Sequence, residues 1–96
     1  MKKFSELKVW KMTISKPMTA GEIEYICSSV CFLAMREAYD IYIELCRVDT
    51  KKDYSVIYFM CEEDTLKYVH KVMQNRLSNL TYKIEETNSM ELQSLP

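Results

Sequence analysis

The chain has 96 residues, of which 48% are hydrophobic, and its 13 basic and 14 acidic residues leave a net charge of -1. This length fits one domain with a single core, and the hydrophobic content argues against intrinsic disorder. The balanced charge lacks the basic excess of duplex-binding proteins. The single Gly excludes Gly-rich phosphate loops.

The sequence also argues against a membrane or secretory role. No apolar run approaches the ~18 residues that a membrane span needs. No apolar stretch follows Lys2 and Lys3, so we expect no signal peptide. We therefore predict a cytoplasmic protein without a membrane partner.

The first expected element is a β-strand over residues 8–15, which alternate with a period of two. Pro17 follows it and has no N–H to give to a strand ladder. We expect the more apolar side of this strand to face the core. That side carries Trp10, Met12 and Ile14, and the other side carries Val9, Lys11 and Thr13.

A helix start is the sharpest local signal in the sequence. Thr19 and Glu22 have the spacing of a capping box, and Met18 and Ile23 flank the cap at the positions of a hydrophobic staple. We expect a helix from residue 19 or 20 to about residue 37 or 38, with an apolar stripe at helical spacing. The stripe consists of Ile23, Ile26, Cys27, Val30, Cys31 and Ala34.

Two strands joined by a polar hairpin are expected next. The first covers residues 41–46, the turn covers residues 49–53, and the second strand covers residues 54–60. Aromatic and β-branched residues in the second strand suit a pleated surface. Ile41, Ile43 and Leu45 alternate with Tyr42, Glu44 and Cys46, and Ser55, Ile57 and Phe59 alternate with Tyr54, Val56, Tyr58 and Met60.

A second helix and a short strand complete the expected elements. Three acidic residues at 62–64 open the helix where its dipole favours negative charge, and Ser78 with Asn79 closes it. The last strand covers residues 80–85. The stripe of this helix is Leu66, Val69, His70, Met73 and Leu77, and the strand alternates Leu80, Tyr82 and Ile84 with Thr81, Lys83 and Glu85.

The order of these elements, β-α-β-β-α-β, predicts the fold class. Two right-handed crossovers and a central hairpin give an α+β, ferredoxin-like βαββαβ domain, with two helices on one face of a four-stranded antiparallel sheet. We expect a single domain over residues 1–87 and a C-terminal tail over residues 88–96. The alternative is an unrelated α+β sandwich with a different strand order.

Residues that could support chemistry are few and scattered. Cys27 and Cys31 are four residues apart on a helix, unlike the Cys-x-x-Cys turn of a zinc site, and Cys46 and Cys61 supply no second pair at known spacing. His70 has no nucleophile nearby in the sequence, so we interpret it as a residue at the edge of the core. We expect no enzymatic activity, no metal and no cofactor, and interpret the cysteines as small apolar residues.

The third expected strand resembles part of an RNA-recognition motif. Residues 52–59, followed by residues 61–64, are similar to the third strand and acidic turn of that family. Tyr54 would occupy one stacking position, and Trp10 in the first strand would occupy another. The resemblance implies bases stacked on Tyr54 and Tyr58.

The motif is incomplete at three positions. Val56 stands where the family has a second aromatic residue, and Asp53 stands where it has glycine. Alternation also turns Trp10 towards the core, where it could not stack on a base. We therefore interpret the similarity as shared fold geometry rather than family membership.

The sheet face opposite the helices is the expected working surface. The third strand is central in this topology, so it should place an apolar and aromatic row across an open face, and patches of that kind commonly mark interfaces. The predicted partner-binding residues are Tyr42, Tyr54, Val56, Tyr58, Met60 and Lys11.

The leading hypothesis for function is a small non-enzymatic protein-binding module. It would act as a regulator or as an inhibitor that occludes a partner surface, for example one encoded by a phage or mobile element against a host defence complex. A homodimer through the same face is a further expectation. The alternatives are binding of single-stranded RNA or DNA by that face, and a regulatory domain that senses a small ligand.

Overall fold

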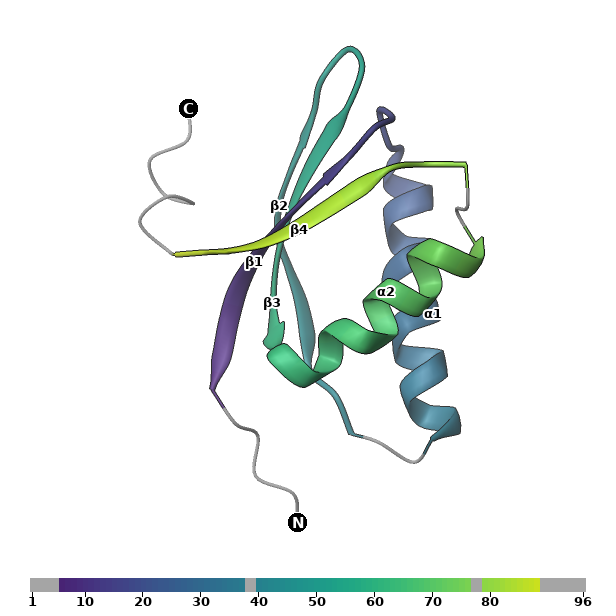
Figure 1. The fold of residues 1–96 in the computed structure, drawn as a ribbon, viewed down its shortest axis with the longest axis vertical. Coiled ribbons are helices and arrows are strands. Elements are labelled where there is room, and N and C mark those ends of the chain that lie inside the picture. Colours follow the sequence, from purple (N-terminus) through teal and green to yellow (C-terminus); the bar gives the residue numbers. More distant parts are fainter. Residues whose placement is uncertain (1–5, 38–39, 77–78, 89–96) are drawn as a thin grey trace.

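The computed structural model of the chain describes residues 6–37, 40–76 and 79–88. Its elements are β1 (Leu7–Ile14), α1 (Ala20–Arg36), β2 (Ile43–Thr50), β3 (Ser55–Glu62), a single 3-10 turn (Glu63–Thr65), α2 (Leu66–Arg76) and β4 (Tyr82–Thr87). The predicted order of elements is confirmed (Figure 1). The strands form one antiparallel sheet in the order β2-β3-β1-β4, so β1 and β3 are central, as in a ferredoxin-like fold. Apart from Asn88, the expected C-terminal tail lies outside the described residues.

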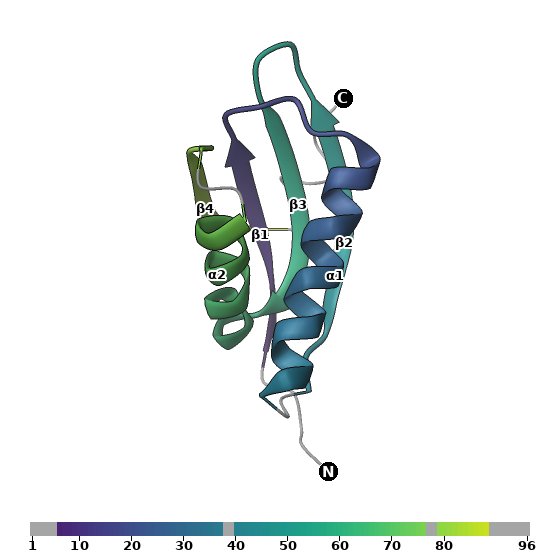
Figure 2. The same ribbon diagram turned by 90° about the vertical axis from the view of Figure 1, so that its right-hand side faces the viewer.

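Both helices lie on the same face of the sheet, as predicted (Figures 1 and 2). Side chains of β1 and β3 alternate between the two faces, and the predicted inward sides do enter the core. The core consists mainly of Trp10, Met12, Ile14, Ile57, Phe59 and Cys61 from the sheet, Ile23, Ile26, Val30 and Ala34 from α1, and Tyr68, Val69, Val72 and Met73 from α2.

The predicted capping box at the start of α1 is present. The Thr19 hydroxyl accepts a hydrogen bond from the Glu22 backbone N–H at 3.1 Å, and the Glu22 carboxylate accepts one from the Thr19 N–H at 3.0 Å. Met18 and Ile23, the expected staple, are both buried in the core cluster. Local chemistry therefore determines where α1 begins.

Glu22 should make the stability of the fold sensitive to acid. A hydrogen bond from the Lys16 ammonium and, to a smaller extent, one from the Thr19 N–H lower the pKa of Glu22 from 4.5 to about 2. A carboxyl whose pKa is lower in the folded state stabilises the fold above its unfolded pKa, and this contribution disappears as the pH falls through the folded value. We therefore expect the melting temperature to drop between pH 4.5 and about pH 2.

The contribution of Glu22 can be isolated with Glu22→Gln, since Gln retains the geometry of a capping box. Its melting temperature should fall less steeply over the same pH range than that of the wild type. Glu24→Gln, an exposed position on the same helix, is the matched control and should keep the wild-type slope. Equal slopes for all three proteins in thermal denaturation would contradict the role of Glu22.

The β2–β3 hairpin is longer than predicted. β2 continues through Thr50, and the turn is closed by a hydrogen bond from the Lys51 N–H to the Tyr54 carbonyl at 2.8 Å. The register with β3 shifts between Leu45 and Arg47, which makes Cys46 a β-bulge. Because of this extra residue, Val48 lies opposite Ile57 on the helix-facing side, whereas strict alternation from Leu45 would place it on the other side.

The second helix starts later than predicted. Glu62 belongs to β3 and is 2% exposed rather than opening the helix. A 3-10 turn follows, and α2 begins only at Leu66. This start sets the phase of the helix, so Tyr68 and Val72 enter the core while Leu66 and His70 are half-buried. The predicted stripe is confirmed at Val69 and Met73, Leu66 packs against the core from its edge, and Tyr68 and Val72 are core residues that the prediction did not include. Residue 77, the last predicted member, lies outside the described residues.

Candidate protein-binding surfaces

The predicted strip on β3 is correctly oriented but is far less exposed than expected. Val56 is 9% exposed, Tyr58 is 2% exposed and Met60 is half-buried, although all three alternate with the core residues of β3. Only Tyr54, which precedes β3, is well exposed, at 43%. The prediction of an exposed row is therefore wrong, because most of these side chains are buried although they lie on the predicted face of β3.

Cross-strand neighbours help to explain the burial of Tyr58. The register places Lys11 of β1 directly opposite it on one side and Arg47 of β2 opposite it on the other. Both basic side chains are half-buried, and the methylene stems of Lys and Arg commonly cover apolar surface while their charged ends stay in water. A central strand has such neighbours on both sides, and an edge strand does not.

The other predicted contact residue on this side, Tyr42, precedes β2 and is 39% exposed. A hydrogen bond with Glu44 raises the pKa of the Tyr42 hydroxyl. Tyr54 lies elsewhere, at a shallow hollow of about 370 Å³ near the start of β4. The hollow is lined by Thr13, Ile14, Ser15, Tyr54, Thr81, Tyr82, Lys83 and Glu85.

The largest exposed apolar side chains of the helix layer lie on α1, a surface that the sequence interpretation missed. Tyr25, Phe32 and Met35 are 47%, 67% and 73% exposed. Their spacing of seven and three residues places them along one side of a helix. We call Tyr25, Phe32 and Met35 the outer face of α1. It lies away from the buried stripe of Ile23, Ile26, Val30 and Ala34.

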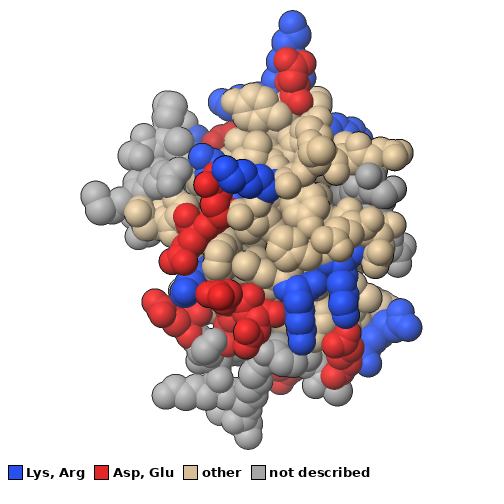
Figure 3. All heavy atoms as spheres, in the orientation of Figure 1, with Lys and Arg blue, Asp and Glu red and all other residues tan. Residues whose placement is uncertain are grey.

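A hollow of about 420 Å³ lies beside the outer face, between the two helices. Arg36 and Lys71 give it a basic border, and the Lys71 ammonium is 3.2 Å from the Glu37 carboxylate. Figure 3 shows basic side chains beside a largely uncharged area over α2. The hollow is lined by Tyr25, Ser28, Ser29, Phe32, Leu33, Arg36, Lys71, Val72 and Asn75.

One sequence signal for this surface was available. No charged residue occurs in the eleven residues from Tyr25 to Met35. A helix that covers a sheet on one side and faces water on the other usually carries charges on its outer side, and a helix that is apolar all round is usually buried all round. The charge-free run therefore indicates that α1 has a second face to bury.

The cysteines and the histidine form no reactive centre in the part of the chain that the structure describes. All four cysteines are free, and no group of three His, Cys, Asp or Glu side chains there could hold a metal ion. Burial raises the pKa of Cys27, and that of Cys61 to about 12, which disfavours the reactive thiolate. Cys61 is buried in the core, which agrees with its interpretation as a small apolar residue, whereas Cys46 is exposed at the bulge. His70 is half-buried, and its Nδ1 lies 2.7 Å from the Tyr82 hydroxyl.

Comparison with known proteins adds no functional assignment. No protein-family model matches the chain, and no curated protein matches it. Among solved structures, the chain is similar to the de novo designed protein Foldit4, with a TM-score of 0.48 and 9% sequence identity. The match covers 86% of this chain and 98% of that one. No helix in the described residues is long and apolar enough to cross a membrane.

Proposed function

We propose that this chain is a small protein-binding module that acts as a regulator or inhibitor by occluding a surface of a partner protein. The outer face of α1 is its contact surface. The observation that carries the proposal is the exposure of three large apolar side chains on a helix whose opposite side is already buried in the core. Exposed apolar groups that lie together on a helix are typical of helix-mediated recognition.

The border of this face indicates the chemistry of the partner. Arg36 is exposed and has no ion pair with any residue in the described ranges. Lys71 lies across the hollow, where its ammonium is paired with the Glu37 carboxylate, so among the described residues Arg36 supplies the unpaired positive charge of this border. A complementary partner would present an apolar surface with an acidic rim, because opposite charges around an apolar centre orient a complex and speed its formation.

The open sheet face supports this function less directly. Because Tyr58 and Val56 are buried, they offer little surface to a partner unless the structure changes. Binding of single-stranded nucleic acid through that face stays a prediction that now depends mainly on Tyr54, since stacking requires an accessible ring. A homodimer also stays a prediction, which light scattering of the purified chain can test.

Phe32→Lys is expected to weaken partner binding by at least about 30-fold, because aromatic anchors that a partner buries often contribute 2 kcal/mol or more. The side chain is 67% exposed, so the variant should fold normally, with a stability change of about 0.5 kcal/mol or less. The measurement is capture of partners from native extract by the tagged chain, followed by calorimetry with the purified partner.

The matched control is Leu7→Lys, which introduces the same residue at another exposed apolar position, at the start of β1. A partner captured by the wild type and by Leu7→Lys, but lost with Phe32→Lys, is the expected result. Partners captured equally by all three proteins would show that the outer face of α1 is not the contact surface.

A further inference from the structure

β2 is an edge strand that offers unpaired backbone groups. It pairs with β3 on one side, and no backbone hydrogen bond among the described residues joins it to any other strand. In an antiparallel sheet, every second residue of an edge strand directs its N–H and C=O groups away from its neighbour. An edge of this kind can accept a further strand from another molecule.

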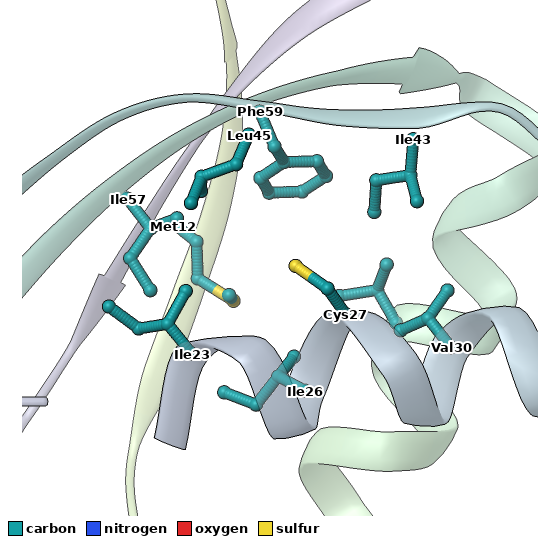
Figure 4. Close-up of a pocket in the computed structure, with 10 residues that line it drawn as sticks. Met12, Ile23, Ile26, Cys27, Val30, Ile43, Leu45, Ile57 and Phe59 are labelled. Carbon is teal, nitrogen blue, oxygen red and sulfur yellow. The ribbon is translucent and has the colours of Figure 1, made fainter. Parts of the chain in front are cut away.

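An apolar groove runs along this edge, between α1 and β2. Its wider part has a volume of about 260 Å³, and a smaller cavity of about 20 Å³ adjoins it, with Ile23 and Leu45 lining both. Figure 4 shows the residues around the smaller cavity. Glu24 and Val48 also line the wider part, and Cys27, Ile43 and Phe59 also line the smaller cavity.

Leu45 shows that the helix layer does not close this side of the core. It lies opposite Phe59 in the β2–β3 register and on the helix-facing side of β2, yet it is 43% exposed, whereas Phe59 is 3% exposed. In Figure 4, Cys27 on α1 points towards the sheet, below the Phe59 ring. Apolar side chains from an added strand would bury the remaining surface of Leu45, which is favourable.

The bulge at Cys46 limits how an added strand can pair. Bulges and charged side chains on an edge are known guards against uncontrolled strand pairing, and Arg47 and Asp49 form an ion pair of 3.1 Å just after this bulge. The edge is thereby divided into a segment beside the smaller cavity and a segment beside the wider part of the groove. This division suits a short peptide better than a long, flat strand.

We propose that β2 accepts a short extended peptide of a partner protein as an additional strand. Apolar side chains at alternate positions of the peptide would enter the α1–β2 groove, because successive side chains of a strand point to opposite sides. A basic side chain would lie next to Glu24, which lines the wider part of the groove and has no ion pair within the described ranges. The site is separate from the outer face of α1.

Selection of short random peptides displayed on phage against the full chain tests the proposal. Enriched peptides should carry apolar residues at alternate positions and at least one Lys or Arg. Binding of the corresponding synthetic peptides should slow amide hydrogen exchange at every second residue of β2, because those N–H groups gain acceptors.

Two substitutions should weaken the binding of these peptides. Leu45→Lys places a charge between the two parts of the groove, and we expect at least about a ten-fold loss of affinity. Glu24→Lys, at an exposed position, should reduce the affinity for the basic peptides by a smaller factor. Phe32→Lys is the matched control and should change the affinity by less than about two-fold, since it is on the other side of α1.

Several outcomes would overturn the proposal. One is that no peptide with apolar residues at alternate positions is enriched. Another is that the enriched peptides bind Leu45→Lys as tightly as the wild type, and a third is that they slow amide hydrogen exchange only outside β2. A dimer of the chain that Leu45→Lys dissociates would assign the edge to a second copy instead. Peptide binding lost only with Phe32→Lys would support the outer face of α1 and reject the groove, so the two proposals fail separately.

Discussion

Tyr58→Ala is expected to lower the free energy of unfolding by about 3–5 kcal/mol, the range measured when large buried aromatic side chains are truncated. Tyr54→Ala is expected to change it by about 0.5 kcal/mol or less, as is usual for exposed positions. The two tyrosines are four residues apart, but Tyr58 is 2% exposed and Tyr54 is 43% exposed. Tyr58 lies on the central strand β3, opposite Lys11 on one side and Arg47 on the other, whereas Tyr54 precedes that strand.

Urea denaturation of the two single variants measures this difference, provided that the slope of each transition stays close to the wild-type value. The result also determines how the sheet face can be tested for binding. If Tyr58→Ala unfolds a large fraction of the chain, loss of binding in that variant says nothing about contact, and Tyr54→Ala is the informative variant. Small and equal effects would instead show that the Tyr58 ring is accessible in solution, and would restore the β3 strip as a contact surface.

Local signals in the sequence predicted the parts of the fold that local chemistry controls. Thr19 and Glu22 satisfy each other's backbone N–H groups within a single turn, so their spacing alone indicates the start of α1. Alternation along β1 likewise gave the correct inward side, because the period of two is a property of the strand itself. Neither feature depends on a residue far away in the chain.

Features that depend on distant partners could not be predicted in the same way. The bulge at Cys46 has no Gly or Pro to mark it and exists only relative to β3. The phase of α2 follows from its start at Leu66, and the buried Tyr68 donates a hydrogen bond from its hydroxyl to the Glu37 carboxylate, 3.1 Å away at the C-terminal end of α1. Apolar residues occur on several sides of this helix, so a 3.6-residue period alone did not select one face.

The candidate site was missed for a different reason. The outer face of α1 has a sequence signature, the charge-free run from Tyr25 to Met35, but a helix was assumed to need only one apolar face. By contrast, the α1–β2 groove has no such signature. It exists because α1 leaves Leu45 partly uncovered at the edge of the sheet.

Trp10→Ala is expected to be as damaging as Tyr58→Ala, lowering the free energy of unfolding by about 3–5 kcal/mol. Trp10 is 6% exposed in the core, and its indole N–H donates a hydrogen bond to the Cys61 carbonyl at 3.1 Å. Trp10→Phe retains an aromatic ring but removes the donor, and should cost about 1–3 kcal/mol. Domains of this kind are stable by only about 5–15 kcal/mol, so both effects are large.

Circular dichroism during urea denaturation measures both variants, and the fluorescence of the wild type adds an independent check because Trp10 is the only tryptophan. Its emission should lie at short wavelength in the native state and move to longer wavelength on unfolding. Single-stranded oligonucleotides should leave the native emission unchanged, since a ring bonded to Cys61 inside the core cannot stack on a base. Small effects of both substitutions, together with quenching by oligonucleotides, would place Trp10 on the outer face of β1. The resemblance to an RNA-recognition motif would then extend to function, because both strands would present an aromatic ring to a bound strand.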